Sequence, residues 1–234
     1  MAQEPFRAGF AFNASDFADN PDPRAPCVLI LDTSGSMDGR AIRELNEGLI
    51  GYQQDVAADQ MASRRVDLAV VRFGGDVEVA QDFISPSQYE PRPLVADGET
   101  PMAAAVLRAM QILEERKREY RAAGIAYYRP WIFLFTDGAP TDCEESWKLA
   151  CEAVRRGEAE GKFTLFAFGV TGADFGKLRE LTSSRQPLQL KRSGFREFFV
   201  WLSASQRRVS EAAVGSSVKL LPSTGDAGWG EVPT

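Results

Sequence analysis

Two runs of apolar residues constrain the fold of this chain more than any other feature. Residues 27–31 read Cys-Val-Leu-Ile-Leu, and residues 131–135 read Trp-Ile-Phe-Leu-Phe. Neither run alternates apolar with polar residues, so both faces of each segment must be covered. Such short continuous runs are typical of parallel strands inside a sheet that carries helices on both sides. The two runs therefore predict the centre of an α/β domain.

The segments around these runs alternate between strand and helix patterns. Further strands are predicted at residues 66–73, 77–83 and 163–170. Helices are predicted at residues 144–160 and 195–208, the second with Phe198, Phe199 and Leu202 facing inward. Two more helices carry apolar stripes at intervals of three and four residues. These stripes are Ile42, Leu45, Leu49, Tyr52 and Val56 in one helix, and Ala103, Val106, Leu107, Met110 and Leu113 in the other.

This alternation predicts a doubly wound, mostly parallel sheet of the Rossmann-like kind, with helices on both faces. Residues 74–76 read Gly-Gly-Asp and predict a tight turn, so the strand at 77–83 returns antiparallel at one edge. Thr100 followed by Pro101 is typical of a helix start, with a hydroxyl at the cap and proline at the first helical position.

The length and composition favour one folded unit with extensions at both ends. A chain of 234 residues with 44% hydrophobic content can bury one sizeable core. Residues 1–26 are proline-containing and show no sustained period, which predicts an irregular arm. Residues 27–212 form the predicted domain. Residues 213–234 are rich in Gly, Ser and Pro, which predicts a flexible tail in which only Trp229 offers an anchor.

Charge and hydropathy exclude several classes of partner. The net charge of −6 disfavours nonspecific attachment to nucleic acid or to an anionic membrane, because both need a basic surface. No segment approaches the ~18 consecutive apolar residues of a membrane span, and the N-terminus lacks the pattern of a leader peptide. We therefore expect a cytoplasmic protein that contacts neither nucleic acid nor membrane. The sequence does not indicate an oligomeric state.

The residues that are missing limit the chemistry further. The chain contains no histidine, which excludes Ser-His-Asp and Cys-His catalysis and histidine-ligated zinc sites. Cys27, Cys143 and Cys151 do not form a Cys-x-x-Cys motif, so buried or incidental thiols are expected, with Cys27 in the core. Any activity must therefore use carboxylates, hydroxyls, lysines or a hard metal ion.

Oxygen-bearing side chains follow the two apolar runs directly. The first run leads into Asp32, Ser34 and Ser36, and the second leads through a Thr-Asp-Gly sequence that contains Asp137. Ligands of open α/β sheets bind at the carboxyl ends of the strands, where both aspartates should meet. Two carboxylates about 4 Å apart repel by about 4 kcal/mol at an effective dielectric constant near 20, and a cation between them removes this repulsion.

Hydroxyl and carboxylate oxygens without nitrogen or thiolate donors suit a hard ion. We therefore favour Mg²⁺, with Mn²⁺ and Ca²⁺ open as alternatives. Taken singly, each motif also has a simpler explanation, because serines cap helices, Thr-Pro starts helices and Asp-Gly forms turns. Asp142 is interpreted as a cap for the helix that follows it. Only the combination of motifs, each beside a predicted strand end or helix start, is specific.

In this order, the Asp-x-Ser-x-Ser motif at residues 32–36, the later Thr100 and the Thr-Asp-Gly turn around Asp137 resemble the metal-ion-dependent adhesion site (MIDAS) of von Willebrand factor A (VWA) domains. The resemblance covers about residues 25–208. It implies that Ser34 and Ser36 bind the ion through their hydroxyls and that Thr100 binds it directly or through water. It places Asp32 and Asp137 against the ion or behind its ligands. One coordination position stays open, which an acidic side chain of a partner protein typically fills.

Residues 128–131, which read Tyr-Arg-Pro-Trp, and the Thr-Asp-Gly-x-Pro-Thr-Asp sequence at residues 136–142 resemble the TerY-like bacterial branch of this family. That branch implies a role in tellurite resistance or stress response beside kinase-like and phosphatase-like partners. Glu99 departs from the family pattern, in which small residues often precede the threonine. It competes for the open position, repels an acidic ligand of that position, or points into solvent, and we favour the last.

Two other functions remain open at this stage. A magnesium-dependent phosphoryl-transfer enzyme would use Asp32 and Asp137, although the sequence contains no Gly-x-x-x-x-Gly-Lys-Ser/Thr loop. A metal-independent adaptor would bind partners through a helix face or through the arm at residues 1–26. We expect an interaction module without enzymatic activity.

Overall fold

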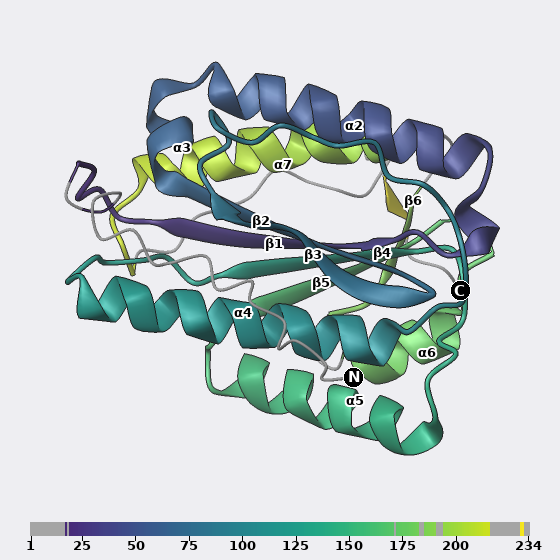
Figure 1. Ribbon diagram of the computed structural model, residues 1–234. Coiled ribbons are helices and arrows are strands. Elements are labelled where there is room, and N and C mark those ends of the chain that lie inside the picture. The colour runs from purple at the N-terminus through teal and green to yellow at the C-terminus, as the bar shows by residue number, and fades with distance from the viewer. Residues whose placement is uncertain are drawn as a thin grey trace, which may run out of the picture.

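The computed structural model describes residues 17, 19–170, 172–182, 185–190, 194–215 and 230–231. A seven-stranded mixed sheet lies between two layers of helices (Figure 1). Its strands are β1 (Ala25–Asp32), β2 (Val66–Gly74), β3 (Asp76–Ile84), β4 (Trp131–Thr136), β5 (Thr164–Gly169), β6 (Leu188–Leu190) and β7 (Gly230–Glu231).

The spatial order of the strands is β3-β2-β1-β4-β5-β6-β7. The five inner strands, β2, β1, β4, β5 and β6, run parallel to one another. At the two edges, β3 pairs antiparallel with β2 and β7 pairs antiparallel with β6. The chain extends the sheet in one direction from β1 to β3 and then returns to the other side of β1 with β4, so the order reverses between β1 and β4. Ligands of doubly wound sheets bind at such a reversal point.

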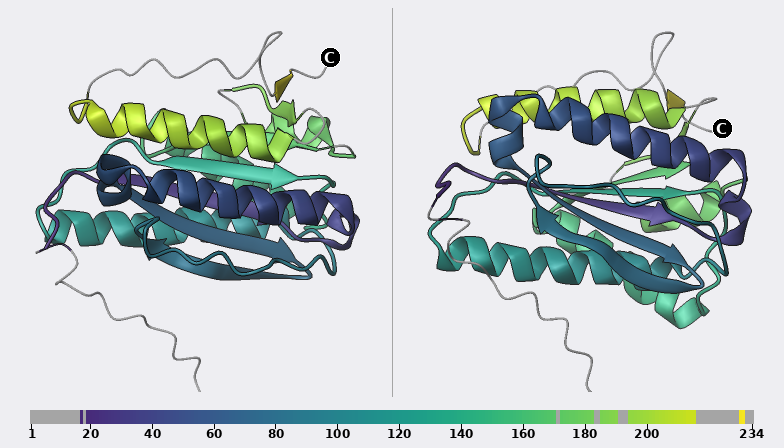
Figure 2. Two further views of the ribbon diagram at one scale, coloured as in Figure 1. Left: turned by 90° about the horizontal axis from the view of Figure 1, so that it is seen from above. Right: turned by 45° about the horizontal axis from the view of Figure 1, so that its top comes forward.

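Helices cover both faces of the sheet, as Figure 2 shows. One face carries α2 (Arg40–Ala57), α3 (Gln60–Arg65) and α7 (Gly194–Glu211). The other carries α4 (Met102–Ala122), α5 (Glu144–Ala159) and α6 (Phe175–Leu181). A single 3₁₀ turn, η1 (Gly35–Met37), links β1 to α2. The predicted doubly wound architecture is confirmed.

The first apolar run is buried on both faces, as its pattern predicts. Cys27, Leu29 and Leu31 pack into the core under α2 and α7, whereas Val28 and Ile30 pack into the core over α4 and α5. The parallel register sets Leu31 opposite Phe135 of β4. The residues that follow these two positions therefore leave the sheet at the same level and on the same edge.

The predicted helical stripe of α2 is confirmed. All five of its apolar residues are buried, and Gly48 lets α2 approach α7, since a Cβ there would lie 2.6 Å from the ring of Phe199. Neighbouring Phe198 in α7 packs edge-on against Phe135, with ring centroids 4.6 Å apart. The stripe of α4 is confirmed only in part, because Leu107 and Met110 are half-buried.

The short elements were not predicted. They are α3, α6, β6, β7 and η1, and none is long enough to show a period in the sequence. The sheet therefore has one antiparallel edge more than the sequence predicted, because Gly230 and Glu231 of β7 pair with β6. Most of the predicted tail, including Trp229, lies outside the described residues, as does most of the arm at 1–26. β1 begins at Ala25, two residues inside the predicted arm.

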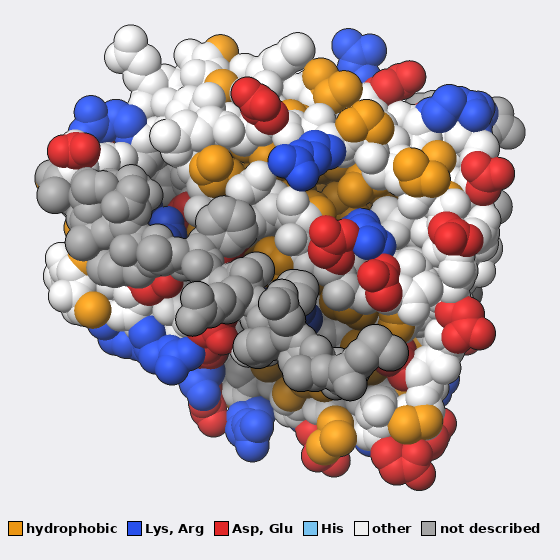
Figure 3. All heavy atoms as spheres, viewed as in Figure 1, with side chains coloured by type: hydrophobic (Ala, Val, Ile, Leu, Met, Phe, Trp, Pro, Cys, Tyr) orange, Lys and Arg blue, Asp and Glu red, His pale blue; other side chains and the backbone are white. Residues whose placement is uncertain are grey.

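None of the described helices combines the length and hydropathy needed to cross a membrane. On the face formed by β3, α2 and α4, acidic and basic side chains are interspersed (Figure 3).

Candidate metal centre

Asp32 ends β1 at the reversal point, and its carboxylate is fully enclosed. The side chain has 0% exposure. Its Oδ1 accepts a hydrogen bond from the backbone N–H of Ser34 at 2.8 Å, and its Oδ2 accepts one from the hydroxyl of Thr136 at 2.5 Å. The parallel register of β1 and β4 delivers Thr136 to this position. Both partners are neutral donors, so the negative charge of Asp32 is hydrogen-bonded but not neutralised.

A chain of hydroxyls connects this buried region to the surface. The Oγ atoms of Ser34 and Ser36 lie 3.1 Å apart, and the Ser36 hydroxyl donates to Oδ1 of Asp137 at 2.6 Å. Ser34 is buried, whereas Ser36 is exposed. The second carboxylate is therefore joined to the first loop through serine hydroxyls, and the arrangement opens outward at Ser36.

Thr100 completes the group of five predicted residues. A Cβ placed on Gly138 would lie 3.5 Å from Oγ1 of Thr100 and 3.8 Å from Oγ of Ser36. Gly138 directly follows Asp137, so the threonine hydroxyl faces the same small space as the serine and the aspartate. The structure thus brings Asp32, Ser34, Ser36, Thr100 and Asp137 together at the carboxyl end of the sheet.

Three loops pack closely behind these side chains. The N–H of Gly35 donates to the carbonyl of Gly98 at 2.9 Å, and the N–H of Gly75 donates to the carbonyl of Glu99 at 2.8 Å. Gly98 adopts φ +73°, and a Cβ there would lie 2.5 Å from Cα of Gly75. Only glycine permits this approach and this conformation. The side chain of Glu99 is exposed, as the sequence analysis favoured.

Burial and the shortage of positive charge disfavour the ionised form of both aspartates. Burial raises the pKa of Asp32, the hydrogen bonds from Ser34 and Thr136 lower it, and the charge of Asp137 raises it again, so that the net shift is upward. Burial likewise raises the pKa of Asp137, and the Ser36 hydroxyl lowers it in part. Among the described residues, no lysine or arginine forms an ion pair with either carboxylate.

The donor set fits a hard divalent cation. It offers carboxylate and hydroxyl oxygens, and no nitrogen or sulfur ligand is among them. Within the described ranges, no group of three or more His, Cys, Asp or Glu side chains could hold a metal. A cation at this place would therefore depend on the hydroxyls of Ser34, Ser36 and Thr100 as well as on the two aspartates.

The structure corrects two interpretations of helix starts. Helix α4 begins at Met102, and the hydroxyl of Thr100 does not cap it. The cap comes from Asp142, whose Oδ2 and Oδ1 accept hydrogen bonds from the N–H groups of Ala103 and Ala104 at 2.9 and 3.3 Å. Asp142 therefore caps α4 and not the helix that follows it, whose N-cap is Cys143. An aspartate two residues before a helix looks like a local cap, and only the tertiary contact reveals its partner.

Sequence reasoning named Thr136 and Gly138 only as parts of the Thr-Asp-Gly turn and assigned them no role. Thr136 donates to Asp32 and accepts a hydrogen bond from the N–H of Gly138 at 3.1 Å, so it joins the two aspartate-bearing segments. The available signal was a single polar residue that ends an otherwise apolar strand.

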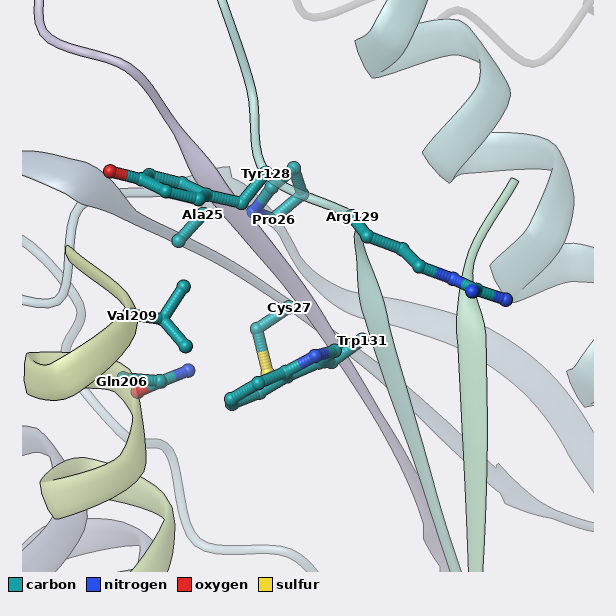
Figure 4. A pocket seen from close by; sticks show the side chains of 8 residues that line it. All are labelled: Ala25, Pro26, Cys27, Tyr128, Arg129, Trp131, Gln206 and Val209. Carbon is teal, nitrogen blue, oxygen red and sulfur yellow. The ribbon is translucent and has the colours of Figure 1, made fainter. Parts of the chain in front are cut away.

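A cavity at the opposite end of the sheet is not a competing site. It lies between the beginning of β1, the beginning of β4 and α7, where the thiol of Cys27 faces Trp131 and Gln206 (Figure 4). Its volume of about 10 Å³ is just enough for one water molecule. Burial raises the pKa of the Cys27 thiol, which keeps it protonated and unreactive.

Comparison with known proteins agrees with this geometry. Residues 27–197 match the family model of the von Willebrand factor type A domain. The chain belongs to this family. The VWA domain of this chain is similar to inter-alpha-trypsin inhibitor heavy chain H4 of Sus scrofa, with 29% identity over 150 residues. That match covers 61% of this chain but only 15% of the relative, so the chain spans a small part of the relative's length.

Solved structures confirm the fold. The pilus adhesin SpaC of Lactobacillus rhamnosus GG, in an open conformation, aligns with a TM-score of 0.62 at 12% identity, over 80% of this chain and 30% of that one. Proximal thread matrix protein 1 from the mussel byssus aligns with a TM-score of 0.51 at 16% identity, over 80% of this chain and 49% of that one. In that structure the MIDAS motif is occupied by zinc.

Proposed function

We propose that this VWA domain is a divalent-metal-dependent protein interaction module that binds Mg²⁺ through Asp32, Ser34, Ser36, Thr100 and Asp137. One observation supports the proposal above the others. Two buried carboxylates share a hydroxyl-lined space with no positive side chain among the described residues to neutralise them. A buried charge is costly unless it is paired or coordinates a metal.

The residues of the candidate centre would have different roles in holding the ion. Asp32 holds the N–H of Ser34 and thereby orients the serine loop, and Thr136 fixes the Asp32 carboxylate. Ser36 and Asp137 lie where the arrangement reaches the surface. When bound there, a divalent cation supplies positive charge and an open coordination position that accepts a carboxylate of a partner protein. Recognition would then require metal and carboxylate together.

Magnesium is favoured over softer ions because every donor is a hard oxygen. Mn²⁺ and Ca²⁺ remain the alternatives, and the zinc in the mussel relative makes Zn²⁺ a necessary comparison. Isothermal titration calorimetry with each of the four ions would rank them. Tighter binding of Zn²⁺ than of Mn²⁺ is expected on chemical grounds at most sites, so the physiological ion must be judged at cellular concentrations.

The central experiment measures metal binding and partner binding with the same variants. Calorimetry with Mg²⁺ should show binding by the natural chain and a large loss for Ser34→Ala and Asp137→Ala. A pull-down from native cell extract, with Mg²⁺ against chelator, should lose the same proteins on chelation and on Asp137→Ala. Partner binding that is indifferent to chelator and to Ser34→Ala would favour a metal-independent adaptor instead.

We propose that the domain acts by binding rather than by catalysis. The competing enzyme would use Asp32 or Asp137 in magnesium-dependent phosphoryl transfer. Asp32 is poorly placed to attack a substrate, since it is fully buried and both of its oxygens accept hydrogen bonds. Turnover of generic phosphoesters by the purified protein with Mg²⁺, lost in Asp32→Ala, would overturn this part of the proposal.

We also propose the TerY-like branch, with kinase-like or phosphatase-like partners in a cytoplasmic stress-response system. It is supported by the sequence at residues 128–142. Part of that sequence has a structural use, because Tyr128 donates to the carbonyl of Ala212 at 2.6 Å and Arg129 donates to the carbonyl of Phe163. Identification of the proteins that are lost on chelation in the pull-down would test the branch.

A further inference from the structure

Two residues beyond the candidate metal centre join the segments that carry it. The N–H of Thr100 donates to Oγ1 of Thr141 at 3.1 Å, and the N–H of Thr141 donates to the carbonyl of Thr100 at 3.0 Å. The carboxylate of Asp142 accepts from Ala103 and Ala104, as described above. We call these four hydrogen bonds, made by Thr141 and Asp142 to residues 100–104, the clasp.

The clasp satisfies the beginning of helix α4. The first N–H groups of a helix have no partner inside it. Pro101 has no N–H, and the N–H of Met102 donates to the carbonyl of Thr100 at 2.8 Å. The next two N–H groups, of Ala103 and Ala104, both donate to Asp142. The position of this helix end therefore depends on a carboxylate about forty residues later in the chain.

Two other helices of the domain, α3 and α6, are capped locally. Asp59 accepts from the N–H of Ala62 at 2.7 Å at the start of α3, and Asp174 accepts from the N–H of Lys177 at 3.0 Å at the start of α6. Each of these aspartates lies three residues from the group that it caps, so the capping hydrogen bond itself joins no second segment. The cap of α4 differs because it ties the loop after β4 to the loop before α4.

These two loops supply Asp137 and Thr100 to the candidate centre. We propose that Thr141 and Asp142 are positioning residues for that centre, which hold the hydroxyl of Thr100 against Gly138 and Asp137. The inference rests on the proposed function. Its physical basis is that both backbone groups of Thr100 are engaged by Thr141, so the backbone that carries the hydroxyl cannot shift without breaking the clasp. Partners that orient metal ligands commonly affect metal affinity about 10- to 100-fold.

The test measures Mn²⁺ affinity of the full chain by calorimetry, with the Mn²⁺ electron paramagnetic resonance spectrum as a second readout. Asp142→Ala is expected to weaken binding about tenfold and to alter the spectrum. Asp142→Asn keeps one acceptor oxygen and should recover part of the affinity. Asp59→Ala is the matched control, because it removes an aspartate cap elsewhere and should leave Mn²⁺ affinity unchanged.

A second pair of variants keeps the test valid if Asp142→Ala folds poorly. Thr141→Val removes the oxygen that accepts from Thr100, whereas Thr141→Ser retains it, so only the first should weaken Mn²⁺ binding. Equal affinities for Asp142→Ala and Asp59→Ala, or for the two Thr141 variants, would overturn the positioning role and leave the metal centre intact. Failure of the natural chain to bind Mn²⁺ would overturn the proposed function and the positioning role together.

Discussion

Two buried aspartates lie on neighbouring strands at opposite ends of the sheet, and they differ in the charge of the groups that donate hydrogen bonds to them. Asp67, near the beginning of β2, accepts hydrogen bonds from Nε of Arg116 at 2.7 Å and from the hydroxyl of Tyr120. Asp32, at the end of β1, accepts hydrogen bonds from neutral donors, among them the backbone N–H of Ser34 and the hydroxyl of Thr136. Asp67 and Asp32 have 3% and 0% exposure, so burial does not distinguish them.

The difference is whether the protein supplies the opposite charge. Arg116 neutralises Asp67 and also packs over the rings of Phe17 and Tyr120, at 4.8 and 5.3 Å from their centroids. At this end the chain itself supplies the charge that balances the aspartate, and we call it the complete end. Its contacts join β2, α4 and Phe17. The other end gathers Asp32 and Asp137 around neutral hydroxyls, which leaves room for a charge from outside the chain. Burial alone therefore does not single out a candidate cation site, whereas a buried carboxylate without a cationic partner does.

The largest effect is expected from breaking the complete end. Arg116→Met should leave Asp67 buried without its hydrogen-bonded cation and lower the free energy of unfolding by about 3–5 kcal/mol. Chemical denaturation would measure this loss, which should be the same with Mg²⁺ and with chelator. Adding Asp67→Asn to Arg116→Met should restore much of the stability, because it removes the unpaired charge. A loss that depends on Mg²⁺ would contradict the separation of the two ends.

The next largest effect is expected at the other end of the sheet, where Asp32 and Asp137 have no cationic partner among the described residues. At a concentration one hundred times its dissociation constant, Mg²⁺ should stabilise the natural chain by about 2.7 kcal/mol. Asp137→Asn should lose this stabilisation, while its stability in chelator stays equal or rises, because the uncompensated charge is gone. Thermal unfolding with and without Mg²⁺ would show both results. Glu152→Gln, an exposed acid on α5, is the control with the same change of charge.

A smaller effect follows from the raised pKa values of Asp32 and Asp137. Between their ordinary value of 3.8 and the higher folded values, the folded state binds more protons than the unfolded state. These two groups therefore lower the stability of the metal-free protein as pH rises through that window. Subtracting the profile of an Asp32→Asn and Asp137→Asn double variant isolates this decline. Metal affinity should fall as pH decreases through the same window.

The smallest effect is expected at Gly138. Gly138→Ala places a methyl group 3.5 Å from Oγ1 of Thr100, which the fold tolerates but which narrows the space that the hydroxyls face. We expect Mg²⁺ affinity to fall about fivefold, close to 1 kcal/mol, with unchanged stability in chelator. Gly51→Ala, in α2 with nothing within 4 Å, should leave affinity unchanged and raise stability by about 0.5–1 kcal/mol. Unchanged affinity in Gly138→Ala would place the ion elsewhere.

The central architecture could be predicted because it depends on periodicity. Apolar runs and stripes report which faces are covered, and they identified β1, β4, α2 and α7. The meeting of Asp32 with Asp137 was predictable too, since parallel neighbours end at the same edge and each aspartate directly follows such a strand. Elements such as α3 and α6 were missed because six or seven residues are too few to show a period.

The sequence by itself determined the fold class and the residues that gather at the carboxyl edge of the sheet. Only the tertiary structure decided that Asp142 caps α4, that Thr136 fixes Asp32, and that Asp67 is neutralised by Arg116. The physical reason is that periodicity is a local property of the chain, whereas hydrogen-bond partners and opposite charges come from segments far apart in it. Those distant partners decide whether the charge of a buried aspartate is balanced inside the chain or is left for a bound cation to balance.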